Sequence, residues 1–187
     1  MPKAYIIHGW TETPESAFFP WMKEELEKRG YDVAIPLLPN TNVPLVDEWI
    51  DFLMELFADR DELSIVVAHS LGGTATLKCM EKMNGDRPFQ KAILIAPAVG
   101  EAINIPPDAE ELAKPWLELS FDGEKIKKSA QHIFSFFSDD DFRVPFSTEK
   151  RVRDEFGAVT FLEKNKGHYA KADQCPEDDA LEEIFIL

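Results

Sequence analysis

The chain has 187 residues and a net charge of −15 at pH 7, with 44% hydrophobic and 29% charged residues. This composition is typical of a soluble globular protein, and the length suits one domain with a hydrophobic core rather than two. The negative charge disfavours nucleic acids and anionic membrane surfaces as partners, because both present phosphate groups.

Two further bulk features narrow the class of protein. The sequence has no apolar run near the ~20 residues that a membrane-spanning helix needs, and its start, MPKAYIIHG, does not follow the pattern of a signal peptide. We therefore expect a cytoplasmic protein. Cys79 and Cys175 are too few for a disulfide framework and lack the spacing of metal ligands, so we expect no metal and no other cofactor.

Short apolar runs alternate with amphipathic stretches along the chain. We predict strands at residues 4–8, 32–36, 64–68, 92–96, 133–137 and 159–162. We predict helices at residues 17–29, 45–58, 72–83, 124–129, 148–155 and 176–186. This alternation predicts an α/β fold of three layers, α/β/α, with a mostly parallel sheet of about six strands. A ligand site is then expected at the carboxyl ends of the strands.

One segment interrupts the alternation. Residues 99–120, VGEAINIPPDAEELAKPWLELS, contain prolines and mixed charges that predict an irregular insertion between the fourth and fifth strands. Two interpretations stay open for it: a wall or partial cover of a site, and a surface excursion without a role. No repeat, low-complexity tract or linker is visible, so we predict a single domain over residues 1–187.

Ser70 stands where a predicted buried strand, IVVA, turns into a predicted helix. A nucleophile elbow has this strand–turn–helix geometry, and its sharp turn requires small residues two before and two after the serine. Here these residues are Ala68 and Gly72, giving AHSLG where G-x-S-x-G is commoner, and Gly73 lets the helix pack close to the sheet. The pattern predicts Ser70 as a nucleophile.

A serine needs a base to remove its proton, and the base needs a third group to orient it. In this kind of fold the chain order is serine, acid, histidine. His132 and His168 are the histidines after Ser70. His132 begins the fifth strand, at the wrong edge of the sheet, whereas His168 follows the sixth strand, so we predict His168 as the general base.

The acid should follow the fifth strand, where Asp139, Asp140 and Asp141 are adjacent. We predict Asp141, because it precedes the short loop that leads to the next helix, and we keep Asp140 as the alternative. The two carboxylates that are not used should face water or cap a turn.

Acyl transfer also needs donors for an oxyanion. We predict the backbone N–H of Leu71, which follows the nucleophile, and the backbone N–H of Trp10, in the loop after the first strand. His8 is expected to be structural, and His69 is expected to point to the other side of its strand.

With these residues in place the chain resembles the α/β-hydrolase superfamily. Within it, the short length and the spacing of 27 residues between Asp141 and His168 are similar to the retinoblastoma-binding-protein-nine or YdeN-like serine hydrolases. Further likenesses are Pro115-Trp116, EKIK at 124–127, Pro145 four residues after Asp141, and Gly167-His168. The resemblance implies a hydrolase sheet without the superfamily's first hairpin, and hydrolysis of small esters.

We therefore predict a serine hydrolase that cleaves small carboxylic esters through an acyl-enzyme intermediate. Its partner would be a small-molecule ester, with no nucleic acid, no membrane and no protein partner indicated. The alternative is a catalytically silent interaction module on the same fold, and other chemistries such as C–C bond hydrolysis are not distinguished by the sequence. Aromatic residues that could form an apolar pocket, or belong to the core, are Trp10, Phe18, Phe19, Trp116, Phe142 and Tyr169.

Overall fold

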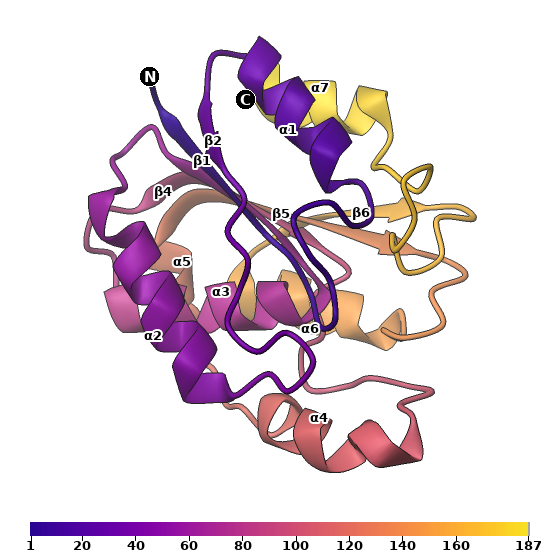
Figure 1. Ribbon diagram of the computed structural model, residues 1–187. Coiled ribbons are helices and arrows are strands. Elements are labelled where there is room, and N and C mark those ends of the chain that lie inside the picture. The colour runs from indigo at the N-terminus through magenta and orange to yellow at the C-terminus, as the bar shows by residue number, and fades with distance from the viewer. Residues whose placement is uncertain (187) are drawn as a thin grey trace.

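The computed structural model describes residues 1–186, in which six strands form one sheet (Figure 1). The strand order is β2-β1-β3-β4-β5-β6, and every pairing between these strands is parallel. The strands are β1 (Lys3–Ile7), β2 (Asp32–Ala34), β3 (Ile65–His69), β4 (Phe89–Ile95), β5 (Ala130–Ser138) and β6 (Val159–Glu163). The predicted α/β fold with a mostly parallel sheet of about six strands is confirmed.

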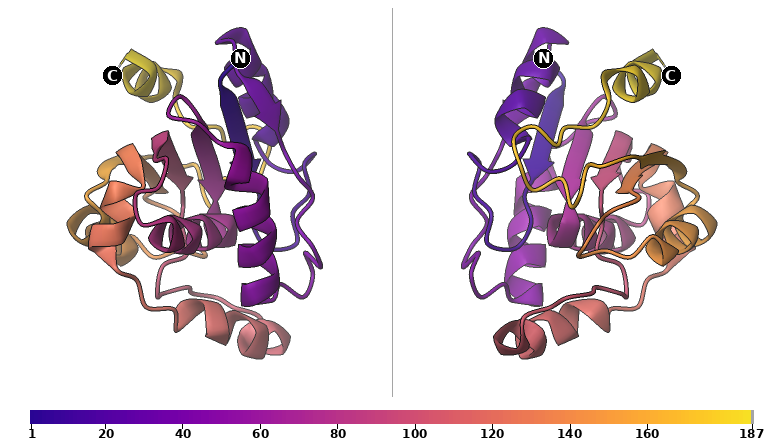
Figure 2. Two further views of the ribbon diagram at one scale, coloured as in Figure 1. Left: turned by 90° about the vertical axis from the view of Figure 1, so that its left-hand side faces the viewer. Right: turned by 90° about the vertical axis from the view of Figure 1, so that its right-hand side faces the viewer.

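Helices cover both faces of the sheet, as the two-sided burial of its strands requires. The α-helices are α1 (Phe19–Lys28), α2 (Val46–Leu56), α3 (Ser70–Met83), α4 (Glu110–Leu117), α5 (Gly123–Lys128), α6 (Ser147–Phe156) and α7 (Asp178–Ile186). Two short 3₁₀ helices are η1 (Phe57–Asp59) and η2 (Pro107–Ala109). Seen from the sides, α1 and α7 lie above the sheet, and α4 lies at the opposite end of the molecule (Figure 2).

The alternation of side chains along β3 explains why there are two cores. Val66 and Ala68 pack in the cluster that holds α2, α3, α5 and α6, whereas Ile65 and Val67 pack in the cluster that holds α1 and α7. All four are fully buried. Because β3 lies between β1 and β4 and all strands are parallel, the loops that follow the strands meet at one edge of the sheet.

The predicted elements match the observed ones closely except in two places. β4 and β5 begin three residues before the predicted strands, because polar residues pair there, such as Lys91 with His132, and interrupt the apolar pattern. The prediction of an irregular insertion at residues 99–120 is wrong in part, since they contain η2 and α4. Pro115 lies inside α4, and its missing N–H and the mixed charges around it conceal the helix in the sequence.

Every helix within residues 1–186 falls short of the length and apolar character that crossing a membrane requires.

Candidate active site

Ser70 lies at a sharp turn between β3 and α3. Its φ is +49°, a left-handed conformation that is costly for any residue except glycine and is found at strained functional turns. Gly72 makes the turn feasible, because a Cβ at this position would lie 2.3 Å from the carbonyl oxygen of His8. The first turn of α3 therefore rests directly on the backbone that leaves β1. This is the geometry of a nucleophile elbow.

Ser70, His168 and Asp141 form a hydrogen-bonded chain. The Oγ of Ser70 lies 2.9 Å from Nε2 of His168, and Nδ1 of that ring lies 2.9 Å from Oδ2 of Asp141. A carboxylate only accepts hydrogen bonds, so Nδ1 carries the ring hydrogen and Nε2 accepts the Ser70 hydroxyl. The structure thus brings together the three residues that we predicted from the sequence as nucleophile, base and acid.

The His168 ring is 11% exposed and Asp141 is 3% exposed. Burial lowers the pKa of His168, and the charge of His69 lowers it further, while the hydrogen bond to Asp141 opposes both effects. The imidazole is therefore neutral at pH 7 and available as a base.

In the described part of the chain, neither Asp139 nor Asp140 is hydrogen-bonded to the His168 ring. Asp139 accepts a hydrogen bond from Asn165 N–H at 3.0 Å, and Asp140 accepts one from Gly167 N–H at 2.7 Å. Both carboxylates thus hold the loop that carries His168, while Asp141, the predicted acid, reaches the ring itself.

His8 has a structural position, as expected. Its Nε2 accepts the Leu38 N–H at 3.0 Å, so the hydrogen is on Nδ1, which donates to the Gly9 carbonyl at 2.8 Å. The ring is fully buried, and burial lowers its pKa. His8 is a neutral ring that connects β1 to the chain after β2.

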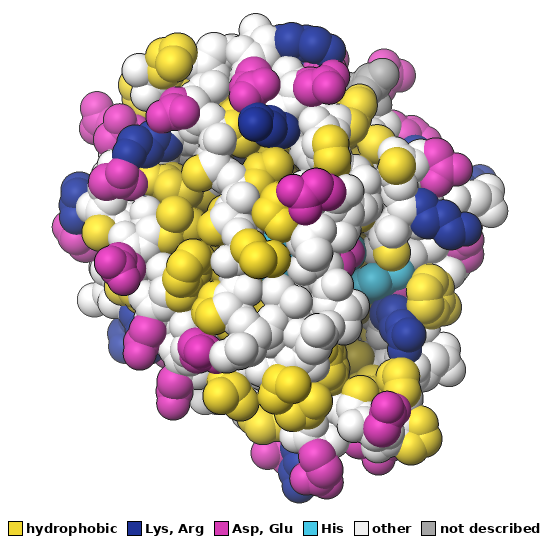
Figure 3. All heavy atoms as spheres, viewed as in Figure 1, with side chains coloured by type: hydrophobic (Ala, Val, Ile, Leu, Met, Phe, Trp, Pro, Cys, Tyr) yellow, Lys and Arg dark blue, Asp and Glu magenta, His cyan; other side chains and the backbone are white. Residues whose placement is uncertain are grey.

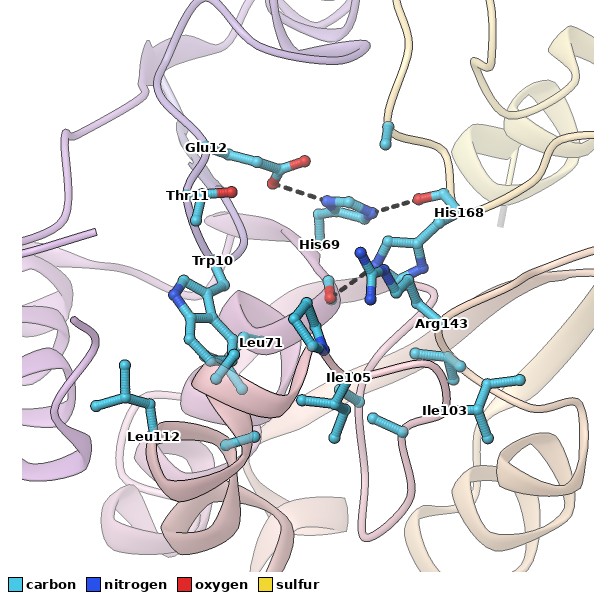
Figure 4. Close-up of a pocket in the computed structure, with 18 of the residues that line it drawn as sticks. Trp10, Thr11, Glu12, His69, Leu71, Ile103, Ile105, Leu112, Arg143 and His168 are labelled. Atoms are coloured by element: carbon cyan, nitrogen blue, oxygen red, sulfur yellow. Dashed lines mark hydrogen bonds and ion pairs between the residues drawn. The ribbon is translucent and has the colours of Figure 1, made fainter. Parts of the chain in front are cut away.

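His69 points to the other side of its strand, as expected, yet its ring still reaches His168. Its ring lies on the α1 side of the sheet, as the strand alternation requires, but it stands at the strand end and contacts the His168 ring at 4.9 Å between centroids. Nδ1 lies 2.9 Å from Glu12 Oε2, and Nε2 lies 2.8 Å from the carbonyl oxygen of His168 (Figure 4). Glu12 was missed because no motif contains it. A carboxylate in the loop after β1 was the only available signal.

The two predicted oxyanion donors belong to the segments that follow β3 and β1. Leu71 is in the first turn of α3, where N–H groups lack intrahelical acceptors. Trp10 is in the loop after β1, and its indole Nε1 donates to the carbonyl of Asn42 at 3.2 Å. Both residues line the cavity beside Ser70, and within residues 1–186 the backbone N–H of Trp10 has no hydrogen-bond acceptor.

A cavity of about 620 Å³ opens beside Ser70 and His168. The segment after β4 forms its apolar wall, and Ile103, Ile105 and Leu112 point into it (Figure 4). Hydrophobic side chains gather on the molecular surface around α4, whereas acidic ones are dispersed along the outline (Figure 3). Of the two interpretations of residues 99–120, the wall is therefore the observed one.

Two of the six candidate pocket aromatics line this cavity, namely Trp10 and Phe142. The pocket interpretation is wrong for Phe18, Phe19, Trp116 and Tyr169, which are buried in the core. Trp116 anchors α4, since its ring packs on Trp49 of α2 at 5.4 Å and its Nε1 donates to the carbonyl of Pro44 at 2.9 Å.

Among the described residues, no group of three or more His, Cys, Asp or Glu side chains is arranged to hold a metal ion. His69 and Glu12, which lie beside the candidate triad, are paired with each other.

Comparison with known proteins places this geometry in a family. The family model described as "Serine hydrolase" matches residues 4–177, which include Ser70, Asp141 and His168. The chain belongs to the serine hydrolase family. It is 31% identical to YdeN of Bacillus subtilis (strain 168) over 167 residues, covering 89% of this chain and 85% of that protein. It is 25% identical to the serine hydrolase RBBP9 of Rattus norvegicus over 170 residues, covering 89% of this chain and 87% of that one.

Solved structures agree with this placement. The ydeN gene product of B. subtilis superposes with a TM-score of 0.86 at 27% identity, over 100% of this chain and 97% of that chain. Est1E from Butyrivibrio proteoclasticus, solved with bound ferulic acid, has a TM-score of 0.78 at 14% identity, over 100% of this chain and 88% of that chain. The likeness to Est1E shows the shared fold. The chain is thus an α/β-hydrolase of the YdeN and RBBP9 type.

Proposed function

We propose that this serine hydrolase cleaves small carboxylic esters through a Ser70–His168–Asp141 triad. The observation that carries the proposal is the hydrogen-bonded chain from Ser70 Oγ through the His168 ring to Asp141, at the opening of a cavity large enough for a small ester. Asp141 fixes the ring tautomer whose free Nε2 faces the serine hydroxyl, which is the arrangement that a base needs.

The reaction then has two halves. His168 Nε2 takes the proton of Ser70 as Oγ attacks the ester carbonyl carbon, and the same proton passes to the departing alcohol as the acyl-enzyme forms. Water enters, gives a proton to His168, and attacks the acyl carbon. The acid is released when the proton returns to Ser70 Oγ.

The oxyanion of each tetrahedral intermediate would be stabilised by the backbone N–H groups of Leu71 and Trp10. Removing one such donor typically costs 10²–10³ in kcat. The close contact of Gly72 with the His8 backbone supports this role, because it holds the first turn of α3 against the segment that leads to Trp10.

The cavity wall favours esters with a short apolar acyl or alcohol group. Ile103, Ile105 and Leu112 provide contact area for such a group, and burying each methylene contributes roughly 0.8 kcal/mol. The reaction needs no group beyond the side chains and amides already named, so we propose that the enzyme works without a cofactor.

Labelling with a fluorophosphonate probe tests the proposal, because this probe phosphonylates serines that a neighbouring base activates. We expect labelling and p-nitrophenyl acetate hydrolysis in the wild-type protein, and loss of both in Ser70→Ala. Ser147→Ala is the matched control, because Ser147 is an exposed serine at the start of α6 that should not affect either signal. A folded wild-type protein that neither reacts with the probe nor hydrolyses esters would favour the silent interaction module instead.

A further inference from the structure

A buried pair of charged side chains, Glu12 and His69, lies directly behind His168. The side chain of His69 is 1% exposed and that of Glu12 is 14% exposed, and their closest atoms are 2.9 Å apart. The Phe18 and Phe19 rings pack against the imidazole at 5.7 and 6.0 Å between centroids. Moving two charged groups out of water into such an environment costs free energy, so the pair is expected to add little to stability. A role in the reaction explains its presence better.

The hydrogen bonds assign the protons in this pair. His69 Nδ1 faces the Glu12 carboxylate, and Nε2 faces the carbonyl oxygen of His168, so both ring nitrogens face acceptors. Both nitrogens must then carry hydrogen, which makes the ring an imidazolium. Burial lowers the pKa of His69, but the charge and hydrogen bond of Glu12, together with the hydrogen bond to the His168 carbonyl and the charge of Asp141, raise it overall, in agreement with this assignment.

The pair connects two loops that the reaction uses. Glu12 Oε2 also accepts the N–H of Gly9, the residue before Trp10, at 2.5 Å. His69 donates to the backbone of His168 at 2.8 Å. The loop with the proposed oxyanion donor and the loop with the proposed base are thus held by one carboxylate and one imidazolium.

The pair also sets the charge around the base. The charged groups near His168 are Asp141 at Nδ1, the His69 ring at 4.9 Å between centroids, Glu12 behind that ring, and Arg143, which lines the same cavity (Figure 4). The positive ring is nearer to His168 than the carboxylate that balances it. It therefore disfavours a second proton on His168 and keeps this ring neutral.

We propose that Glu12 and His69 are positioning residues for the hydrolysis: as an ion pair they align the Trp10 and His168 loops and keep His168 in its neutral form. The inference rests on the proposed function. Glu12 and His69 line the cavity, but their described hydrogen bonds go to each other and to the backbone of Gly9 and His168, not to Ser70 or to the His168 ring nitrogens. They act through the backbone and the ring of His168.

The pH profile of kcat/KM tests this role. Activity requires His168 neutral and His69 charged, so the profile falls at acid pH when His168 gains a proton and at alkaline pH when His69 loses one. Glu12→Gln keeps the shape of the side chain and removes its charge, which makes His69 lose its proton at lower pH. We expect the alkaline limb to move to lower pH and kcat at pH 7 to fall roughly 10- to 100-fold, with KM little changed.

Three further variants separate the charge from the packing. Glu12→Asp keeps the carboxylate and should retain the alkaline limb near its wild-type position. His69→Gln keeps a donor toward the His168 carbonyl but cannot titrate, so its alkaline limb should disappear while kcat stays reduced. Glu15→Gln makes the same chemical change at an exposed residue of the same loop and should match the wild type.

The protonation of His69, measured by nitrogen-15 histidine NMR in the same proteins, distinguishes the possible failures. Ester hydrolysis with an unchanged pH profile in Glu12→Gln would overturn the positioning role and leave the proposed function standing. A neutral His69 at pH 7 in the wild type would also overturn it. If the NMR shows an imidazolium but Ser70-dependent activity is absent, the proposed function fails and the positioning role fails with it.

Discussion

Three adjacent carboxylates at the end of β5 have three different partners. Asp141 binds the His168 ring and also accepts the backbone N–H groups of Arg143 and Val144, at 2.7 and 3.0 Å. Asp140 and Asp139 bind only the backbone of the His168 loop and side chains near it. The effect of removing one charge should therefore depend on which of the three is changed.

Asp141→Asn and Asp140→Asn form a matched pair of variants. An asparagine at 141 can donate to Nδ1, which favours the wrong tautomer of His168, so we expect kcat to fall by roughly 10⁴. An asparagine at 140 still accepts the Gly167 N–H, so we expect a loss of less than about tenfold. Steady-state kinetics with p-nitrophenyl acetate, together with thermal unfolding of each variant, measures the difference. An equal loss in both variants would contradict the assignment of Asp141 as the acid.

The role of a single residue could be predicted from the sequence where a local sequence pattern indicates that role. Ser70 follows a buried strand and precedes two glycines, and chain order then points to His168 and to the acids before it. Glu12 and His69 were not predictable, because their contact depends on how the loop after β1 folds back over the strand end. Strand alternation correctly places His69 on the α1 side, but it does not show that the ring still reaches His168.

At the scale of elements, α4 determines what fits beside Ser70. Trp116 fixes the helix to α2, and Leu112 and Ala113 face the cavity. The strands were predictable from continuous apolar runs, because both faces of a parallel sheet are buried. The α4 helix was not, because its eight residues include Pro115 and only two are buried.

The wall formed by α4 and the segment before it should limit the acyl chain. We expect p-nitrophenyl acetate and butyrate to react faster than the palmitate, because no larger cover is present in residues 1–186 to enclose a long chain. Leu112→Ala should raise kcat/KM for the octanoate relative to the acetate about three- to tenfold by enlarging the cavity. Glu111→Ala, an exposed change on the same helix, is the control. A wild-type preference for the palmitate would contradict the expected size limit.

At the scale of the whole molecule, the net charge of −15 acts on every charged substrate. Thirty-five acidic residues face twenty basic ones in the sequence, and acidic side chains are dispersed over the visible surface (Figure 3). Arg143 is the one Lys or Arg that lines the cavity in the described part of the chain. The field at the opening is thus expected to repel anions, and salt should weaken it.

Three esters with the same p-nitrophenol leaving group test this field: those of butyric acid, of succinic acid with one free carboxylate, and of 4-(trimethylammonio)butyric acid. Between about 20 and 300 mM NaCl, we expect kcat/KM to rise roughly two- to fivefold for the anionic ester. It should fall for the cationic ester and stay constant for the neutral one. The same salt response for all three esters would mean that salt changes the protein itself and not the electrostatic attraction or repulsion between the enzyme and its substrate.

The separation of the cavity wall from the reacting groups has a consequence for how such a protein can diverge. Ser70, His168, Asp141 and the two amide donors come from the segments after β1, β3, β5 and β6, whereas most of the apolar wall comes from the segment after β4. That segment is held at its ends by the hydrogen bond from Thr74 Oγ1 to the Ala98 carbonyl and by the packing of Trp116 on α2, and in its middle by hydrogen bonds to the loop after β5. Substitutions of its apolar side chains between these anchors would change which esters fit, and so which nutrients or toxins an organism could break down, without altering the residues of the triad.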